Sequence, residues 1–214
     1  IPELIYVNPL KDKKMATQQL TIPMFPLNMV LLPGETKTLH IFEERYKQLV
    51  ADCLDNEAHF GIPFMHQKAM GDYGIEVKIS NVIKLYENGE LDIAIEAIRV
   101  FKIIEFSKVL TPKLYGAGVI QFEEEITENP SHLLQELTKE YMWVSQENII
   151  PIDAFDNTNV YGIARLLDLS APEKYELIKA KSAINKEEYL KPKIKLFIHL
   201  IKTENELKSK FVLN

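Results

Sequence analysis

The chain has 214 residues, of which 46% are hydrophobic and 26% charged, fractions that are typical of a folded globular protein and argue against disorder. Its formal net charge of −6 disfavours a general nucleic-acid binder, because such a protein needs a cationic surface to neutralise phosphates. A single cysteine, Cys53, excludes an intramolecular disulfide and fits a reducing compartment, so we expect a cytoplasmic protein.

The N-terminal residues carry no sign of a signal peptide. Charged residues at positions 11–14 interrupt the apolar run that such a signal needs, and no run in the chain approaches the ~20 apolar residues that span a bilayer. We therefore expect no membrane partner. The first residue is Ile1 rather than Met, so Met15 is a candidate for the natural start, and we interpret residues 1–19 as an N-terminal extension.

Residues 20–125 have the pattern of a β-rich domain. Apolar residues alternate with polar ones between Ile75 and Leu85, which predicts a half-buried strand. Glu76, Lys78 and Lys84 fall on the opposite face of this strand, so we expect them in solvent.

A hairpin and a bulge are predicted after this strand. Asn88-Gly89 stands between two alternating runs, which indicates a hairpin with a type I′ turn. Beyond Ala97 the apolar residues change to the other parity, which predicts a β-bulge between Ala97 and Arg99. Such a bulge bends a sheet and helps it to curl into a barrel.

One helix is inserted in this β-rich domain. Phe42, Tyr46, Leu49, Val50 and Cys53 recur at helical spacing and form one apolar stripe. We expect Cys53 on this stripe to be a buried core thiol rather than a nucleophile.

The second half of the chain, residues 130–214, is predicted to be a bundle of helices. An acidic, turn-rich stretch at residues 123–130 separates it from the β-rich half. Apolar stripes at helical spacing lie within residues 133–144, 160–167 and 190–201. Another helix is expected to begin after Ser170, with Ser170 and Glu173 in a capping box. Strands followed by helices predict an α+β fold.

No motif for catalysis or metal binding stands out. None of the eight glycines lies in a P-loop, and the chain has neither a Gly-x-Ser-x-Gly elbow nor a His-Glu-x-x-His pair. Cys53, His59 and His66 do not have a spacing that binds zinc. We therefore expect no enzyme activity, no cofactor and no metal.

One continuous stretch carries a resemblance to a known family. It reads Ile-Pro-Met-Phe-Pro-Leu at 22–27, Val-Leu-Leu-Pro-Gly-Glu at 30–35 and Leu-His-Ile-Phe-Glu-Glu-Arg-Tyr at 39–46. This order of a strand, a Pro-Gly turn and an entry into a helix resembles the opening of the Lon protease substrate-binding domain, and Ile41 and Phe42 are expected to pack that helix onto the sheet.

Weaker matches follow in the family's order, so the resemblance covers about residues 20–205. They are Phe60-Gly61-Ile62-Pro63, Gly74, the Asn88-Gly89 hairpin, Arg99-Val100-Phe101 and residues 172–178. The chain departs from the family pattern at Ile75 and Ala97, where threonine and glycine are usual.

The resemblance implies a PUA-like β-barrel domain over residues 20–125, followed by the helical bundle. It also implies a non-enzymatic module that binds unfolded or specific protein segments, with an adaptor role in protein quality control and a separate ATPase or protease as partner. A small-molecule binding protein of the PUA-like fold is the alternative. Arg45, Tyr46 and Arg99 are the residues that we expect on the substrate-binding surface.

Overall fold

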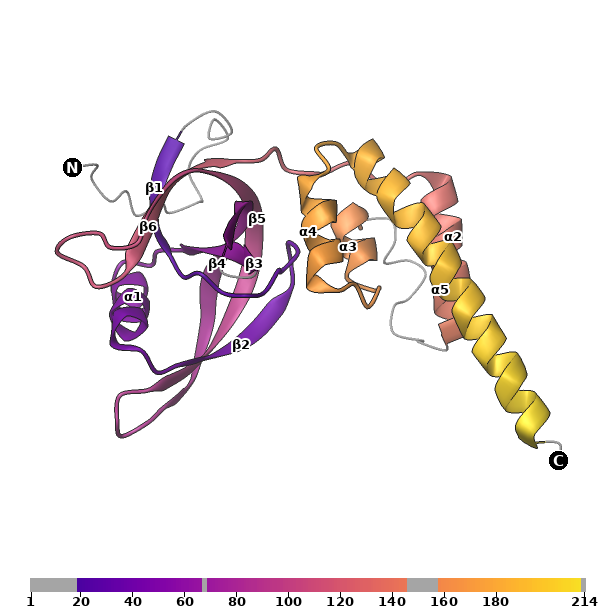
Figure 1. Cartoon of the computed structure of the whole chain (residues 1–214), viewed down its shortest axis with the longest axis horizontal. Helices are drawn as coiled ribbons and strands as arrows, with labels where there is room; N and C mark the ends of the chain where they lie inside the picture. The colour runs from indigo at the N-terminus through magenta and orange to yellow at the C-terminus, as the bar shows by residue number, and fades with distance from the viewer. Residues whose placement is uncertain (1–18, 67–68, 146–157, 213–214) are drawn as a thin grey trace. The chain divides into compact units, whose positions relative to one another are not determined.

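The computed structural model describes residues 19–66, 69–145 and 158–212 (Figure 1). The chain divides into two compact units, the first ending at Glu125 and the second beginning at Ile126. Strands and one helix make up the described part of the first unit, and helices that of the second, so the predicted α+β class is confirmed. Of the predicted N-terminal extension, only Gln19 lies within the described residues.

The first unit is a closed β-barrel with one additional strand. Its strands are β1 (Gln19–Met24), β2 (Thr36–Ile41), β3 (Phe60–His66), β4 (Ala69–Leu85), β5 (Leu91–Ser107) and β6 (Gly116–Phe122). β5 pairs with both β4 and β6, so the order β5-β4-β3-β1-β6 returns to β5 and closes a ring. β1 and β3 are parallel, the other neighbours are antiparallel, and β2 pairs with the first half of β5.

Buried apolar side chains from three strands of this ring, β1, β5 and β6, form one cluster of the barrel's core. They are Leu20, Ile22, Met24, Phe101, Ile120 and Phe122, all at most 3% exposed. Because successive residues of a strand point to opposite faces, the even-numbered residues of β1 all reach this cluster. Leu20, Ile22 and Met24 therefore form the inward face of β1.

The predicted bulge is present, and the hairpin is present with a different turn. Glu76 pairs with Arg99 and Val77 with Ala97, which leaves Ile98 as the extra residue of β5. The hairpin closes with the Tyr86 N–H donating to the Glu90 carbonyl at 2.9 Å. Only Gly89 in this turn has a positive φ, of 78°, so the type I′ prediction, which requires two such residues, is wrong.

The outer half of the β4–β5 hairpin, where β5 pairs with β2, extends beyond β1, β3 and β6 (Figure 1). Ile83 and Leu85 are 52% and 67% exposed there, whereas Glu76, which was expected in solvent, is 1% exposed. Three register shifts along β4 change which face each residue occupies, so a single alternating phase over the whole strand was wrong.

The inserted helix is α1 (Glu44–Asp55), and four of the five residues of its predicted stripe are buried: Tyr46, Leu49, Val50 and Cys53. Phe42 precedes the helix and is 59% exposed, with its ring stacked 6.1 Å from that of His40. The expectation that Phe42 packs the helix onto the sheet is therefore wrong, because the helix begins two residues later. Cys53 is 2% exposed, as predicted for a core thiol.

The described part of the second unit has the helices α2 (His132–Ser145), α3 (Val160–Ala164), α4 (Ala171–Lys179) and α5 (Ala183–Val212). The other three pack against α5, whose buried face carries Leu190, Ile194 and Ile198. The predicted capping box is present: the backbone N–H and hydroxyl of Ser170 donate to Glu173 Oε2 at 2.9 and 2.7 Å. No helix in the described ranges is both long and apolar enough to cross a membrane.

Candidate functional site

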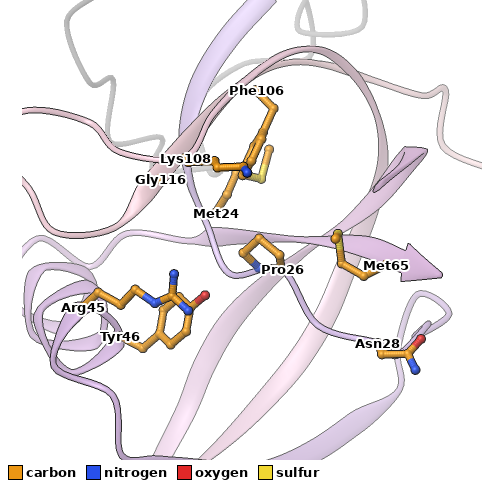
Figure 2. A pocket seen from close by; sticks show the side chains of 9 residues that line it. All are labelled: Met24, Pro26, Asn28, Arg45, Tyr46, Met65, Phe106, Lys108 and Gly116. Atoms are coloured by element: carbon orange, nitrogen blue, oxygen red, sulfur yellow. The ribbon is translucent and has the colours of Figure 1, made fainter. Parts of the chain in front are cut away.

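A hollow of about 240 Å³ opens at one end of the barrel, beside the first turn of α1 (Figure 2). β1, β3 and β5 end there and β6 begins there, so residues from five elements or their flanking loops meet at this place. The residues that line the hollow are Met24, Pro26, Asn28, Arg45, Tyr46, Met65, Phe106, Lys108 and Gly116.

The inner part of the hollow is formed by Met24, the last residue of β1, which is fully buried. Two glycines on the neighbouring strands leave space for its side chain. A Cβ added at Gly61 would lie 2.7 Å from Met24 Sδ, and at Gly118 the nearest atom would be Met24 Cε. Met65 adds a second thioether, and such unbranched, polarizable side chains adapt to apolar groups of different shapes.

Aromatic rings form two walls of the hollow. Tyr46 stacks on Phe25 with ring centroids 3.8 Å apart, and Phe25 in turn lies 6.3 Å from the ring of Phe60. This packing fixes the ring of Tyr46, and burial raises the pKa of its phenol above the ordinary value. Phe106, near the end of β5, is a second aromatic lining residue and packs partly buried against the core cluster.

The edge of the hollow carries positive charge. The Arg45 guanidinium lies 4.5 Å from the centroid of the Tyr46 ring and pairs with Glu43, with Nη2 2.7 Å from Oε2. Lys108 follows β5, is exposed, and has no ion pair within the described residues. None of the lining residues is acidic, so the two cations border an apolar surface.

Arg99, the third residue expected at a binding surface, does not line this hollow. Its Nε donates to Oε2 of Glu76 at 2.8 Å, and its guanidinium carbon lies 3.7 Å from the centroid of the Phe122 ring. His59 Nδ1 lies 3.0 Å from the other oxygen of Glu76. Burial favours the neutral acid, but the hydrogen bonds from His59 and Arg99 prevail and hold the pKa of Glu76 below its ordinary value.

The structure thus brings Arg45 and Tyr46 together at one site and engages Arg99 elsewhere. Sequence reasoning did not identify Met24, Met65, Phe106 or Lys108 as site residues. Met24 lies in the stretch that carries the family resemblance, but its residue type indicated only a strand. Lys108 reaches the hollow through the pairing of β5 with β6, which no local pattern in the sequence reveals.

The zinc site considered for Cys53, His59 and His66 has no counterpart among the described residues. Cys53 is buried on α1 and His59 is engaged with Glu76. Within residues 19–66, 69–145 and 158–212, no group of three or more His, Cys, Asp or Glu side chains is placed to hold a metal ion.

Comparison with known proteins gives one family. The model of the ATP-dependent protease La (LON) substrate-binding domain matches residues 21–190. A Lon N-terminal domain protein from Xanthomonas campestris has a similar crystal structure, with 25% sequence identity, a TM-score of 0.64, and coverage of 79% of this chain and 96% of that one.

The N-terminal domain of the Lon protease of the Mycobacterium avium complex has the same fold. It is 14% identical, with a TM-score of 0.59, and the match covers 85% of this chain and 98% of that one. No curated protein matches the chain significantly.

Proposed function

The chain belongs to the family of Lon protease substrate-binding domains, and from this premise we propose that it binds exposed segments of unfolded or specific proteins at the hollow beside α1. The observation that carries the proposal is the surface of that hollow. Met65 and Phe106 offer a partly exposed apolar surface above the buried Met24 and Tyr46, and Arg45 and Lys108 border it with donors. An apolar side chain that is exposed in an unfolded segment gains free energy by leaving water for such a surface.

The methionines support binding of varied segments rather than one ligand. Flexible, methionine-rich surfaces repack around side chains of different shape, which is how promiscuous binding proteins accept many partners. Met65 lies at the end of β3 and is partly exposed, so its side chain has room to change rotamer.

The size of the hollow favours a protein segment over a free metabolite. Sites for small organic ligands enclose roughly 300 to 1,000 Å³ and bury most of the ligand. The volume here, about 240 Å³, is below that range, and the hollow is open at its edge. A single side chain of a longer segment fits this geometry better than a whole small molecule, which was the alternative function.

We place the chain in recognition rather than in catalysis. Its sequence carries no P-loop, no nucleophile elbow and no zincin motif. In this proposal an ATPase or protease would act on the bound segment, and the present module would deliver that segment as an adaptor.

A substitution that fills the hollow tests the proposal. Asn28 is exposed at its edge, so Asn28→Trp adds a large side chain there without disturbing the core. Fluorescence anisotropy with short labelled peptides that contain one leucine or phenylalanine should show binding by the wild type and at least tenfold weaker binding by Asn28→Trp.

Asn81→Trp is the matched control, because Asn81 is also exposed, lies on β4 and does not line the hollow. It should bind as the wild type does. The proposal fails if the wild-type chain binds no such peptide, or if Asn28→Trp and the control bind equally well.

A further inference from the structure

We infer that the hollow prefers segments in which an acidic side chain stands near the apolar one that it accepts, with Lys108 as the residue that sets this preference. The inference rests on the proposed function and adds to it a ligand class: an internal, extended stretch of polypeptide with one large apolar residue and a neighbouring Asp or Glu. Lys108 is thereby a specificity-determining residue.

The apolar part of this ligand follows from the volume and the lining. A closed apolar cavity of about 150 Å³ in another protein holds benzene, so about 240 Å³ is enough for one aromatic or branched aliphatic side chain. Met65 and Phe106, both partly exposed, supply the contacting surface above the buried Met24 and Tyr46, and none of these side chains presents a charge at pH 7. A charged side chain has no counter-ion in that part of the hollow and would lose its hydration there.

The acidic part follows from the charge of the edge. Lys108 is exposed and forms no ion pair among the described residues, so its ammonium is available to a ligand. Arg45 uses Nε and Nη2 on a single oxygen of Glu43, which leaves the Nη1 donors unused by that pair. Two of the lining residues are basic and none is acidic, so with Glu43 paired to Arg45 the lining keeps the charge of Lys108 uncompensated.

The chain as a whole is negatively charged, opposite to the edge of the hollow, so a preference for acidic segments can arise only at that edge. The formal net charge of the chain is −6, so its overall field disfavours an acidic segment. Selection of such a segment must therefore come from short-range contacts at the hollow, where Lys108 and Arg45 act within a few ångströms.

The position of the two cations favours an internal acidic residue over a peptide's terminal carboxylate. They come from different elements, Arg45 from α1 and Lys108 from the loop before β6, and Figure 2 shows them at separate edges of the hollow. An extended segment can place acidic side chains before and after its apolar residue, two positions away on the same face, about 7 Å along the chain. A chain terminus offers a carboxylate on one side only.

Peptides that differ only in flanking charge test the inference on the full chain. Three labelled peptides with amidated ends share one central phenylalanine and have Asp, Asn or Lys two positions from it. A fourth is the Asn peptide with a free carboxylate at its end. We expect the Asp peptide to bind about two- to fivefold more tightly than the Asn peptide, and the difference to shrink at high salt.

Substitution of Lys108 should reverse this order. Lys108→Glu is expected to prefer the Lys peptide over the Asp peptide, and Lys108→Arg to keep the wild-type order. Lys37→Glu is the matched control, because Lys37 is exposed on β2, does not line the hollow, and changes the net charge by the same amount. Lys37→Glu should bind the four peptides in the wild-type order.

Each contrary result has a separate meaning. Equal binding of the Asp, Asn and Lys peptides overturns the inference and leaves the proposed function intact. Equal effects of Lys108→Glu and Lys37→Glu on the order of peptide binding also overturn the inference, since the net charge of the chain alone would then set that order. A preference confined to the free carboxylate assigns the site to chain termini instead. Binding of none of the peptides removes the proposed function itself.

Discussion

Arg99 and Glu76 form an ion pair between β5 and β4, with Nε donating to Oε2 at 2.8 Å and the Glu76 carboxylate only 1% exposed. They are cross-strand partners next to the bulge at Ile98, which therefore aligns the arginine with the acid. His59 lies against the other carboxylate oxygen. A charge that is this buried is tolerated because both of its oxygens have partners.

Removal of the arginine is therefore expected to destabilise the barrel. Arg99→Met leaves the Glu76 carboxylate buried with His59 alone, and the loss of one partner of a buried pair costs about 3 kcal/mol or more. Arg99 keeps 23% of its side chain exposed, so we expect a value near the lower end of that range. Urea unfolding of the wild type and the variant measures the difference in free energy of unfolding.

The Lys78–Glu96 pair on the same two strands is the control. Its Nζ–Oε2 distance is 2.9 Å, but both side chains are more than a third exposed, so Lys78→Met should cost at most about 1 kcal/mol. Equal losses for Arg99→Met and Lys78→Met would show that burial of Glu76 does not determine the stability of this pair.

Met24 and Gly118 should be energetically coupled. Met24→Ala is expected to cost about 2–5 kcal/mol through the cavity that it leaves, and Gly118→Ala about 1–3 kcal/mol through overpacking against Met24 Cε. In the double variant the smaller side chain at position 24 makes room for the added methyl group. The double loss should therefore be smaller than the sum of the single losses, as a double-mutant cycle in urea would show. Strictly additive losses would mean that Gly118 does not serve to accommodate Met24.

Much of the fold could be predicted because it is written in local patterns. The strand that contains Ile75, the hairpin at Asn88-Gly89, the bulge after Ala97 and the capping box at Ser170 each depend on residues close together in the chain. Glu76 was misplaced because its burial depends on a bulge in the opposite strand and on His59, 17 positions away.

Of the residues that line the hollow, only two were predicted as site residues, and these are neighbours in the sequence. Arg45 and Tyr46 stand together in the stretch that resembles the Lon family, and both line the hollow. Phe106 and Lys108 come to the same place because β5 is long enough to pair with β6 after it has paired with β4. Pairing between strands so far apart in the chain leaves no periodic signal in a single sequence. The apolar and cationic parts of the hollow that depend on this pairing could therefore not be predicted.

Cys53 should be inert toward thiol reagents in the folded protein. It is 2% exposed on the buried face of α1, and burial, with a smaller effect of Asp52, raises the pKa of its thiol to about 12. The thiolate is the reactive form, so native protein at pH 8 should react with a disulfide reagent only as fast as it opens, while urea-unfolded protein reacts at once. A fast, stoichiometric reaction of the native protein would contradict the buried position of this side chain.

Glu173 should titrate far below an ordinary glutamic acid. A hydrogen bond from Lys193, with Nζ 2.7 Å from Oε1, and hydrogen bonds from Ser170 lower its pKa from 4.5 to about 2. Because the pKa is lower in the folded state, the stabilisation is complete above pH 4.5 and is lost as the pH falls from 4.5 toward 2.

Titration of the Glu173 carboxyl carbon by NMR would measure this pKa directly. Lys193→Met should raise it toward 4.5, whereas Lys191→Met, which removes a lysine paired with Glu187 and Glu188, should leave it unchanged. If the two variants shift the pKa of Glu173 equally, the cause is the general field of the lysines rather than the contact between α4 and α5.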